Sequence, residues 1–183
     1  LELDERGFPV NWKISGTTTF GSPVEEYFQA NDDVARWRDA SGPGDANYKS
    51  DPDFYVNQNG SSYANALLVR ALLQSPDGKI PVYPSGEASV VKRWTRRVES
   101  GGVKADVTAY QILGLDTDPR LVFFDDEGEY FGTASPRSAI VRQGFEAIEQ
   151  QLRALSEALS TDRFVDIQAA VAHQFDRPVR ILN

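Results

Sequence analysis

Acidic side chains form the densest group of potential ligands and catalysts in this sequence. Two clusters of closely spaced acids occur, one at Asp116 and Asp118 and the other at Asp125, Asp126, Glu127 and Glu129. Such acids can bind a cation, but the alternating oxygen ligands, central glycine and distal glutamate of an EF-hand loop are absent. Because acids around a glycine are typical of a tight turn, we interpret both clusters as solvated turns.

The other catalytic residue types are scarce. The single histidine, His173, lies near the end of a predicted helix, where a protonated imidazole is stabilised without any further function. No cysteine and no Gly-x-Ser-x-Gly elbow occur, and the segment Gly16–Gly21 lacks the lysine of a phosphate-binding loop. We therefore predict no catalytic residues, no metal ligands and no cofactor site in this chain. The enzymatic alternative is a pair of acids that face each other across a cleft.

Charge narrows the classes of partner. The chain carries a net charge of −8, and its one basic run consists of Lys92, Arg93, Arg96 and Arg97. These cations fall on both faces of a predicted strand, so we interpret them as a solvated or salt-bridged edge rather than an anion site. Nucleic acid is an unfavourable partner, because neutralising its phosphates requires a basic surface. No apolar run approaches the roughly 20 residues of a membrane span.

The elements that must position these side chains are mostly strands. Residues 103–133 form the densest strand-forming stretch of the sequence. Within it, the apolar run 121–124 predicts a strand that is covered on both faces. Gly101-Gly102 indicates a tight turn that pairs the beginning of this stretch with residues 88–100. The sequence therefore predicts an antiparallel sheet centred on this stretch.

The remaining segments are expected to surround that sheet. Short alternating strands in 10–39 predict a meander, and the glycine, proline and aspartate of 40–53 predict a loop. Apolar residues three and four apart predict a helix over 62–74 that lies on the sheet. Ser135-Pro136 is typical of a helix start, so we expect one helix over about 136–160 and a second from 161 to 174.

Together these elements predict the α+β class. We expect a curved antiparallel sheet, or a half-barrel like that of lipoprotein carriers, packed by one helix and followed by a long C-terminal helix. The predicted divisions are a sheet domain over 1–135, C-terminal helices over 136–174, and a linker or first strand of a following domain over 175–183.

Aromatic residues on the predicted strands are interpreted first as core. If the sheet curls into an open barrel, some of them would instead line an apolar groove. The candidates for such a groove are Trp12, Phe20, Phe28 and Trp94.

Four stretches, taken together, resemble a known arrangement. They are ISGTTTFGSPVEEYF at 14–28, SSYANALLVRALLQSPDGKIPVYPSGEA at 61–88, VTAYQILGLDTDPRLVFFDDEGEYFGTASP at 107–136, and the final RPVRILN. This order is similar to the β-rich region that precedes the catalytic domain in exported bacterial amidohydrolases related to imidazolonepropionase. The family's His-x-His pair and later metal ligands have no matching positions here.

The resemblance implies a non-catalytic N-terminal module whose partner is a following amidohydrolase barrel. Segment 40–53 and the helix over 136–160 would then be the surfaces that meet the barrel. It also implies a periplasmic or secreted location, and the absence of methionine leads us to expect a removed targeting peptide or a fragment of a longer protein. The alternative is a stand-alone periplasmic module that holds an apolar ligand or lipoprotein in a curved sheet groove.

Overall fold

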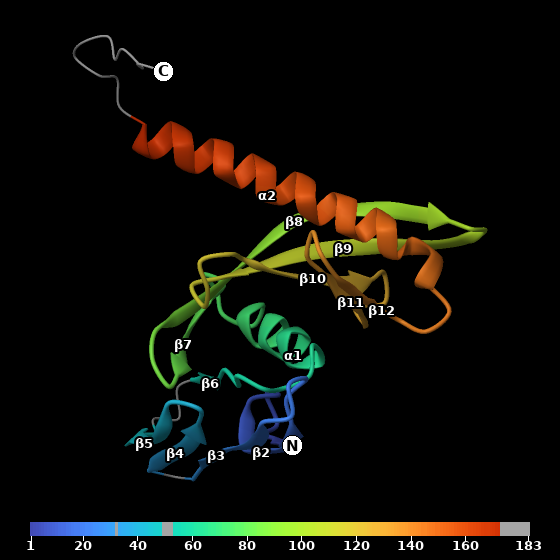
Figure 1. The fold of residues 1–183 in the computed structure, drawn as a ribbon. Coiled ribbons are helices and arrows are strands. Elements are labelled where there is room, and N and C mark those ends of the chain that lie inside the picture. Colours follow the sequence, from blue (N-terminus) through green and yellow to red (C-terminus); the bar gives the residue numbers. More distant parts are fainter. Residues whose placement is uncertain (32, 49–52, 173–183) are drawn as a thin grey trace, which may run out of the picture.

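The computed structural model describes residues 1–31, 33–48 and 53–172 (Figure 1). The strands are β1 (Glu2–Leu3), β2 (Pro9–Thr17), β3 (Pro23–Ala30), β4 (Val34–Asp39), β5 (Gly42–Asn47), β6 (Phe54–Tyr55), β7 (Lys79–Tyr83), β8 (Glu87–Ser100), β9 (Val103–Leu113), β10 (Arg120–Asp125), β11 (Tyr130–Ala134) and β12 (Ala139–Val141). The helices are α1 (Tyr63–Leu72), the 3-10 turn η1 (Glu146–Ile148) and α2 (Glu149–Val171).

The strands form two sheets with a helix between them. One sheet holds β1 to β5 in sequence order, and the other runs β12-β11-β10-β9-β8-β7-β6. The neighbouring strands pair antiparallel except for the short parallel pair of β6 and β7. Figure 1 shows the seven-stranded sheet curling around α1, the five-stranded sheet on the far side of α1, and α2 across the opposite face.

The predicted fold class is confirmed. The chain is α+β, with a curved antiparallel sheet packed by one helix and followed by a long C-terminal helix. The structure adds a division that the strand pattern did not predict, because β1 to β5 form a sheet of their own. Alternating residues identify which strands are half-buried, but they do not identify which sheet each strand joins.

Strand β10 joins the two hydrophobic cores of the molecule. Val122 and Phe124 belong to the core that includes α1 and the five-stranded sheet. Leu121 and Phe123 point to the other face and belong to the core that includes α2. All four side chains are buried, so the prediction of a strand covered on both faces is confirmed.

Helix α1 is buried on more sides than its sequence pattern predicts. The expected apolar stripe along this helix is buried. Ala66 and Val69, which lie outside that stripe, are buried as well. The reason is that α1 lies between two sheets, so its second side also faces an apolar layer. A helix in such a position has only its ends and one narrow side exposed to solvent.

The prediction of a loop over 40–53 is wrong in its first half. Residues Gly42–Asn47 form β5, which pairs along β4 with Ala35 opposite Ala46 and Trp37 opposite Gly44. The indole of Trp37 covers Gly44 so closely that a Cβ there would lie 2.6 Å from the ring. The strand is therefore held by its backbone partner and by one aromatic contact rather than by strand-forming side chains.

The predicted boundaries of the C-terminal helices are also wrong. Ser135-Pro136 begins a turn in which the Ser135 hydroxyl accepts the backbone N–H of Ser138 at 3.1 Å, and β12 then extends the sheet. Gly144, with a φ of +88°, precedes the helix proper. No break occurs at Thr161, whose hydroxyl donates to the Glu157 carbonyl at 3.0 Å within one continuous helix.

Two further expectations concern the C-terminal residues and the possibility of a membrane-spanning helix. His173 and residues 175–183, predicted to be a linker or the first strand of a following domain, lie outside the described residues. Within the described ranges, neither helix combines the length and the apolar character that crossing a bilayer requires.

The packing of α2 predicts an asymmetric response to truncation of its side chains. Leu152 is fully buried against the seven-stranded sheet, whereas Val165 is exposed further along the same helix. Replacing Leu152 by alanine should lower the free energy of unfolding by about 3 kcal/mol, because it leaves a cavity in a packed core. Val165→Ala, the control, should change it by less than about 0.5 kcal/mol. Urea unfolding measures both, and equal effects would contradict the described packing.

Candidate functional site

The four candidate groove residues do not lie together. Trp12 and Phe28 are buried in the α1 core, where the Phe28 ring stacks on Tyr55 with centroids 4.7 Å apart. Phe20 lies in the turn between β2 and β3 and is 96% exposed. Trp94 belongs to the α2 core, with its ring centroid 5.8 Å from that of Phe123. They therefore occupy three different environments.

Trp94 and much of the basic run share a surface hollow between β8 and α2. The hollow has a volume of about 300 Å³ and is lined by Lys92, Arg93, Trp94, Arg96, Leu155, Ala158, Leu159 and Asp162. The Arg96 guanidinium lies 5.2 Å from the centroid of the Trp94 ring, a cation–π distance. Arg97 points elsewhere, to Asp106 at 3.8 Å. The strand is irregular at this point, because the register with β9 shifts between Lys92 and Trp94.

The acidic turn after β10 is held together by the hydrogen bonds and the ion pair of Asp125. Asp125 accepts the backbone N–H groups of Glu127 and Glu129 at 3.0 and 2.8 Å and an ion pair from Arg142 at 2.7 Å. Burial opposes ionisation of Asp125, but the hydrogen bonds and the Arg142 charge outweigh it, so its pKa is lowered. Arg142 also donates to the Tyr130 carbonyl at 2.8 Å, which fastens the end of β12 to this turn.

The other acidic cluster is divided between two arginines. Asp116 accepts from Arg120 at 2.8 Å, and Asp118 accepts from Arg163 of α2 at 3.1 Å. Among the residues that the structure describes, no group of three or more acids or histidines is arranged to hold a metal ion. Both clusters therefore serve turns and ion pairs in this structure.

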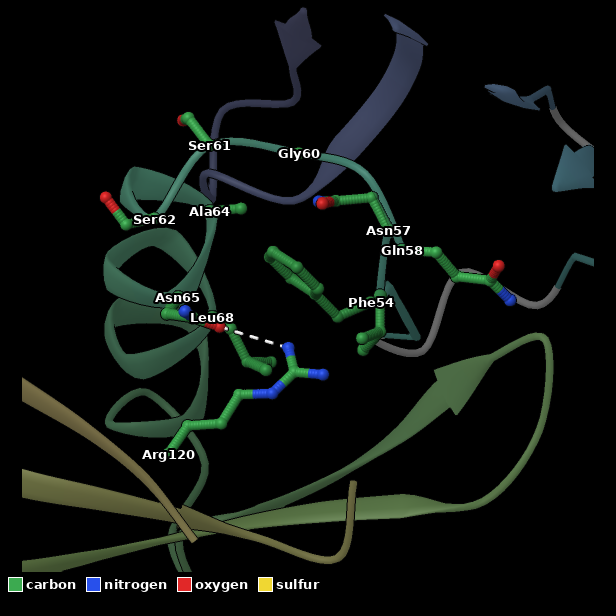
Figure 2. Close-up of a pocket in the computed structure, with 11 residues that line it drawn as sticks. Phe54, Asn57, Gln58, Gly60, Ser61, Ser62, Ala64, Asn65, Leu68 and Arg120 are labelled. Carbon is green, nitrogen blue, oxygen red and sulfur yellow. Dashed lines mark hydrogen bonds between the residues drawn. The ribbon is translucent and has the colours of Figure 1, made fainter. Parts of the chain in front are cut away.

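A polar pocket that the sequence did not predict lies at the beginning of α1. Its volume is about 150 Å³, and its polar lining comes from Asn57, Gln58, Ser61, Ser62, Asn65 and Arg120. Phe54, Val56, Ala64 and Leu68 form its apolar part. Figure 2 shows Asn57 extending across the loop towards Gly60, above the ring of Phe54, while Arg120, the first residue of β10, extends towards Asn65 of α1.

Hydrogen bonds hold the α1 side of this pocket. The Arg120 Nη1 atom donates to the Asn65 side-chain oxygen at 3.2 Å, which Figure 2 marks with a dashed line. The Tyr130 hydroxyl donates to the Ser62 hydroxyl at 3.0 Å. Ser62 precedes α1 but makes no side-chain capping bond.

The loop on the other side of the pocket is fastened by Glu26 of β3. This buried carboxylate accepts the Tyr55 hydroxyl and the Gln58 backbone N–H, both at 2.8 Å. Its second oxygen accepts the backbone N–H of Asn59 at 3.0 Å and the Asn59 side-chain amide at 3.2 Å. Burial, the hydrogen bond to Glu26 and the charge of that carboxylate raise the pKa of the Tyr55 hydroxyl.

Sequence reasoning missed this pocket because its parts are distant in the chain. Glu26 and its loop partners are separated by 29 to 33 positions, and Arg120 lies 55 positions from Asn65. The local signal is the segment Asn57-Gln58-Asn59-Gly60, whose amides and glycine are typical of a turn and do not by themselves indicate a pocket. A charged residue on the core face of an alternating strand, Glu26, was the one feature that could have indicated a buried partner.

The four hydrogen bonds that Glu26 accepts, here called the Glu26 clasp, predict a large loss of stability when this residue is replaced by the nearly isosteric glutamine. Glu26→Gln removes the negative charge from four hydrogen bonds and places an amide donor against other donors. The free energy of unfolding should fall by about 3 kcal/mol. The adjacent and exposed Glu25→Gln should have almost no effect, and chemical denaturation measures both. Equal stability of the two variants would exclude a structural role for the clasp.

The turn after β10 predicts a pH dependence with a defined sign. Because the pKa of Asp125 is lowered on folding, its contribution is present above the usual aspartate value of about 3.9 and is lost as the pH falls through the lowered pKa. Asp125→Asn should therefore destabilise the protein by about 2 kcal/mol at neutral pH. The difference from the parent should shrink in strong acid. Asp126→Asn, at an exposed neighbouring position, is the control in thermal unfolding across this pH range.

Comparisons with known proteins give no family for this chain. The sequence matches no protein-family model, and neither the curated proteins nor the solved structures contain a significant match. A functional proposal therefore depends on the geometry of the described residues and on the resemblance seen in the sequence. The features available to it are the polar pocket, the hollow beside Trp94 and the surface of α2.

Proposed function

We propose that this chain is a non-catalytic accessory module that precedes the catalytic domain of an exported, metal-dependent amidohydrolase. In that protein the module has a structural role or gates access of the substrate to the catalytic domain. We place the protein in the periplasm or outside the cell. The order of the four resembling stretches suggests the family. The single observation that best supports a docking role is the exposed apolar surface on the second half of α2.

That surface contrasts with the first half of the same helix. Leu152 and Leu159 are buried against the seven-stranded sheet. Further along, the exposed large apolar side chains are Phe164, Val165, Ile167 and Val171, with Phe164 at 62% and Val171 at 69% exposed. Figure 1 shows this part of α2 continuing past the strands that its first half covers. Clustered apolar side chains on a soluble surface are typical of a site that another protein surface covers.

The surface differs from those that the resemblance implied. Segment 40–53 contributes β5 to the five-stranded sheet, and the first half of α2 is occupied by its own core. Phe164, Val165 and Ile167, on the second half of α2, are exposed and are the side chains that a following domain would contact. A helix fixed at one end by a packed core can carry such a domain in a defined direction.

A second candidate is the stand-alone module that holds an apolar ligand. The hollow beside Trp94 favours it, since Leu155 and Leu159 add apolar surface there. Trp12 and Phe28 give it no support, because both rings are packed within the α1 core. The accessory module is therefore the better-supported function.

Thiol labelling of single-cysteine variants tests the proposal, because the chain contains no cysteine. Val165→Cys is placed on the exposed half of α2, and Phe20→Cys, the matched control, on an exposed turn. In the 183-residue chain both thiols should react rapidly. In the full product of the reading frame that encodes these residues, Val165→Cys should react several-fold more slowly while Phe20→Cys is unchanged.

Two results would contradict the accessory role. One is a reading frame that ends directly after Asn183, which would leave no catalytic domain to carry. The other is a longer product in which Val165→Cys still reacts as fast as it does in the 183-residue chain. Slow reaction of Val165→Cys in the 183-residue chain itself would instead indicate self-association of this surface, and would also count against the proposal.

A further inference from the structure

We propose that the polar pocket at the beginning of α1 binds a small organic carboxylate. This inference is independent of the docking role of α2, because the pocket lies on the α1 side of the seven-stranded sheet and α2 lies on the other. It rests on a largely buried asparagine whose amide is open to the pocket, an arginine with an unused donor nitrogen, and the size and composition of the pocket walls.

Asn57 is the residue that first indicates a ligand. Its side chain is aimed into the pocket and only 9% of the residue is exposed. Within the described part of the chain, the Asn57 amide makes no hydrogen bond, and its nitrogen and oxygen are open to the pocket rather than sealed in the core. Asn57 therefore offers a donor and an acceptor to a bound molecule.

Arg120 supplies the charge. Its Nε atom donates to Asp116 at 2.8 Å and its Nη1 atom to Asn65 at 3.2 Å. The Nη2 atom has no partner among the described residues, although Arg120 lines the pocket. These two bonds hold the planar guanidinium in one orientation. A guanidinium fixed in this way is well suited to a carboxylate, whose two oxygens match its donors.

The N-terminal end of α1 strengthens the preference of the pocket for an anion. The pocket lies against Ser61 and Ser62, at the N-terminal end of a ten-residue helix. The backbone N–H groups of Ala64 and Asn65 already donate to the carbonyls of Ser61 and Ser62, so this helix end contributes its partial positive charge rather than free donors. The Ser62 hydroxyl accepts from Tyr130 and points away from Asn57 and Arg120 in Figure 2, so it adds no donor to the pocket interior. The preference for an anion therefore comes from the Arg120 guanidinium and the partial charge of the helix end.

Two acids lie nearby, and neither removes this preference. Asp116 balances part of the Arg120 charge through the Nε atom and leaves the Nη2 atom available. Glu26 already accepts four hydrogen bonds from Tyr55, Gln58 and Asn59. The negative charge of Glu26 is therefore directed at the loop rather than at the interior of the pocket.

The apolar walls and the volume define the class of anion. Phe54 and Leu68 are almost completely buried, and they give one part of the pocket an apolar surface. A cavity of about 150 Å³ holds a molecule about as large as benzene. Inorganic phosphate would leave the apolar wall without a partner. A carboxylate with a short branched or aromatic body uses both parts of the pocket.

The pocket is also fixed in shape before any ligand enters. Glu26 holds the backbone of residues 58 and 59, directly after Asn57. Gly60 packs directly against the end of the Asn57 side chain, so a Cβ there would displace the Asn57 amide. A site held in this way loses little conformational freedom on binding.

Amide-resolved NMR titration of the 183-residue chain tests this proposal. The probes are isobutyrate and benzoate, their neutral amides isobutyramide and benzamide, and inorganic phosphate. At least one carboxylate should give saturable shifts confined to residues 57–65 and 120 at up to about 10 mM, where millimolar ligands approach saturation. The matching amide should bind about tenfold more weakly, because it loses the charge-assisted hydrogen bond to Arg120.

Variants separate the pocket from general charge effects. Arg120→Gln should weaken carboxylate binding about tenfold or more, and Asn57→Ala should weaken it several-fold. Arg97→Gln is the matched control, since it also removes one arginine and one aspartate ion pair, and it should bind as the parent does. If Arg120→Gln does not fold, the comparison of each carboxylate with its amide and the Asn57→Ala variant still decide the question.

Several outcomes would overturn the inference. The first is the absence of saturable shifts with either carboxylate, which would make the pocket a solvent-filled hollow. The second is equal binding of carboxylate and amide, or tighter binding of phosphate, either of which would exclude the proposed ligand class. The third is binding that Arg120→Gln and Asn57→Ala leave unchanged, which would place the ligand elsewhere. Loss of the docking role of α2 alone would leave these results unaffected.

Discussion

The burial of β10 on both faces is the constraint on which the rest of the structure depends. Val122 and Phe124 need an apolar cover on one side, and Leu121 and Phe123 need one on the other. Each of these side chains contributes about 2 kcal/mol when it leaves water, so neither face can remain open without a large loss. Helix α1, together with the five-stranded sheet behind it, covers one face, and the first half of α2 covers the other.

This arrangement also explains why the two candidate functional surfaces are separate. The apolar core between α2 and the seven-stranded sheet reaches Leu159, so Phe164, Val165 and Ile167 further along the helix remain exposed. On the opposite face, α1 begins where the chain leaves β6, and the intervening loop must be held by something other than strand pairing. Glu26 supplies that support from the five-stranded sheet, and the polar pocket forms beside it.

Local sequence patterns predicted most of the regular elements correctly, but they missed strand β5 and wrongly predicted a helix after Ser135-Pro136. The β8–β9 hairpin, the α1 stripe and the doubly covered strand β10 follow from periodicity and turn residues, and the structure contains them. Strand β5 was missed because its sequence, GPGDAN, has no strand-forming side chain and depends on its partner β4. The helix predicted after Ser135-Pro136 was wrong because β12 pairs with β11, a contact that outweighs the local helix signal.

The sequence by itself determined the fold class, the central strands and the scarcity of catalytic side chains, since these depend on composition and on spacing within short segments. Only the tertiary structure decided the division into two sheets, the separation of the four candidate aromatics and the position of the polar pocket. The physical reason is that the pocket joins Glu26, Asn57, Asn65 and Arg120, whose contacts span up to 55 positions of the chain. Such contacts form only when the two sheets and α1 pack together, and no local pattern encodes them.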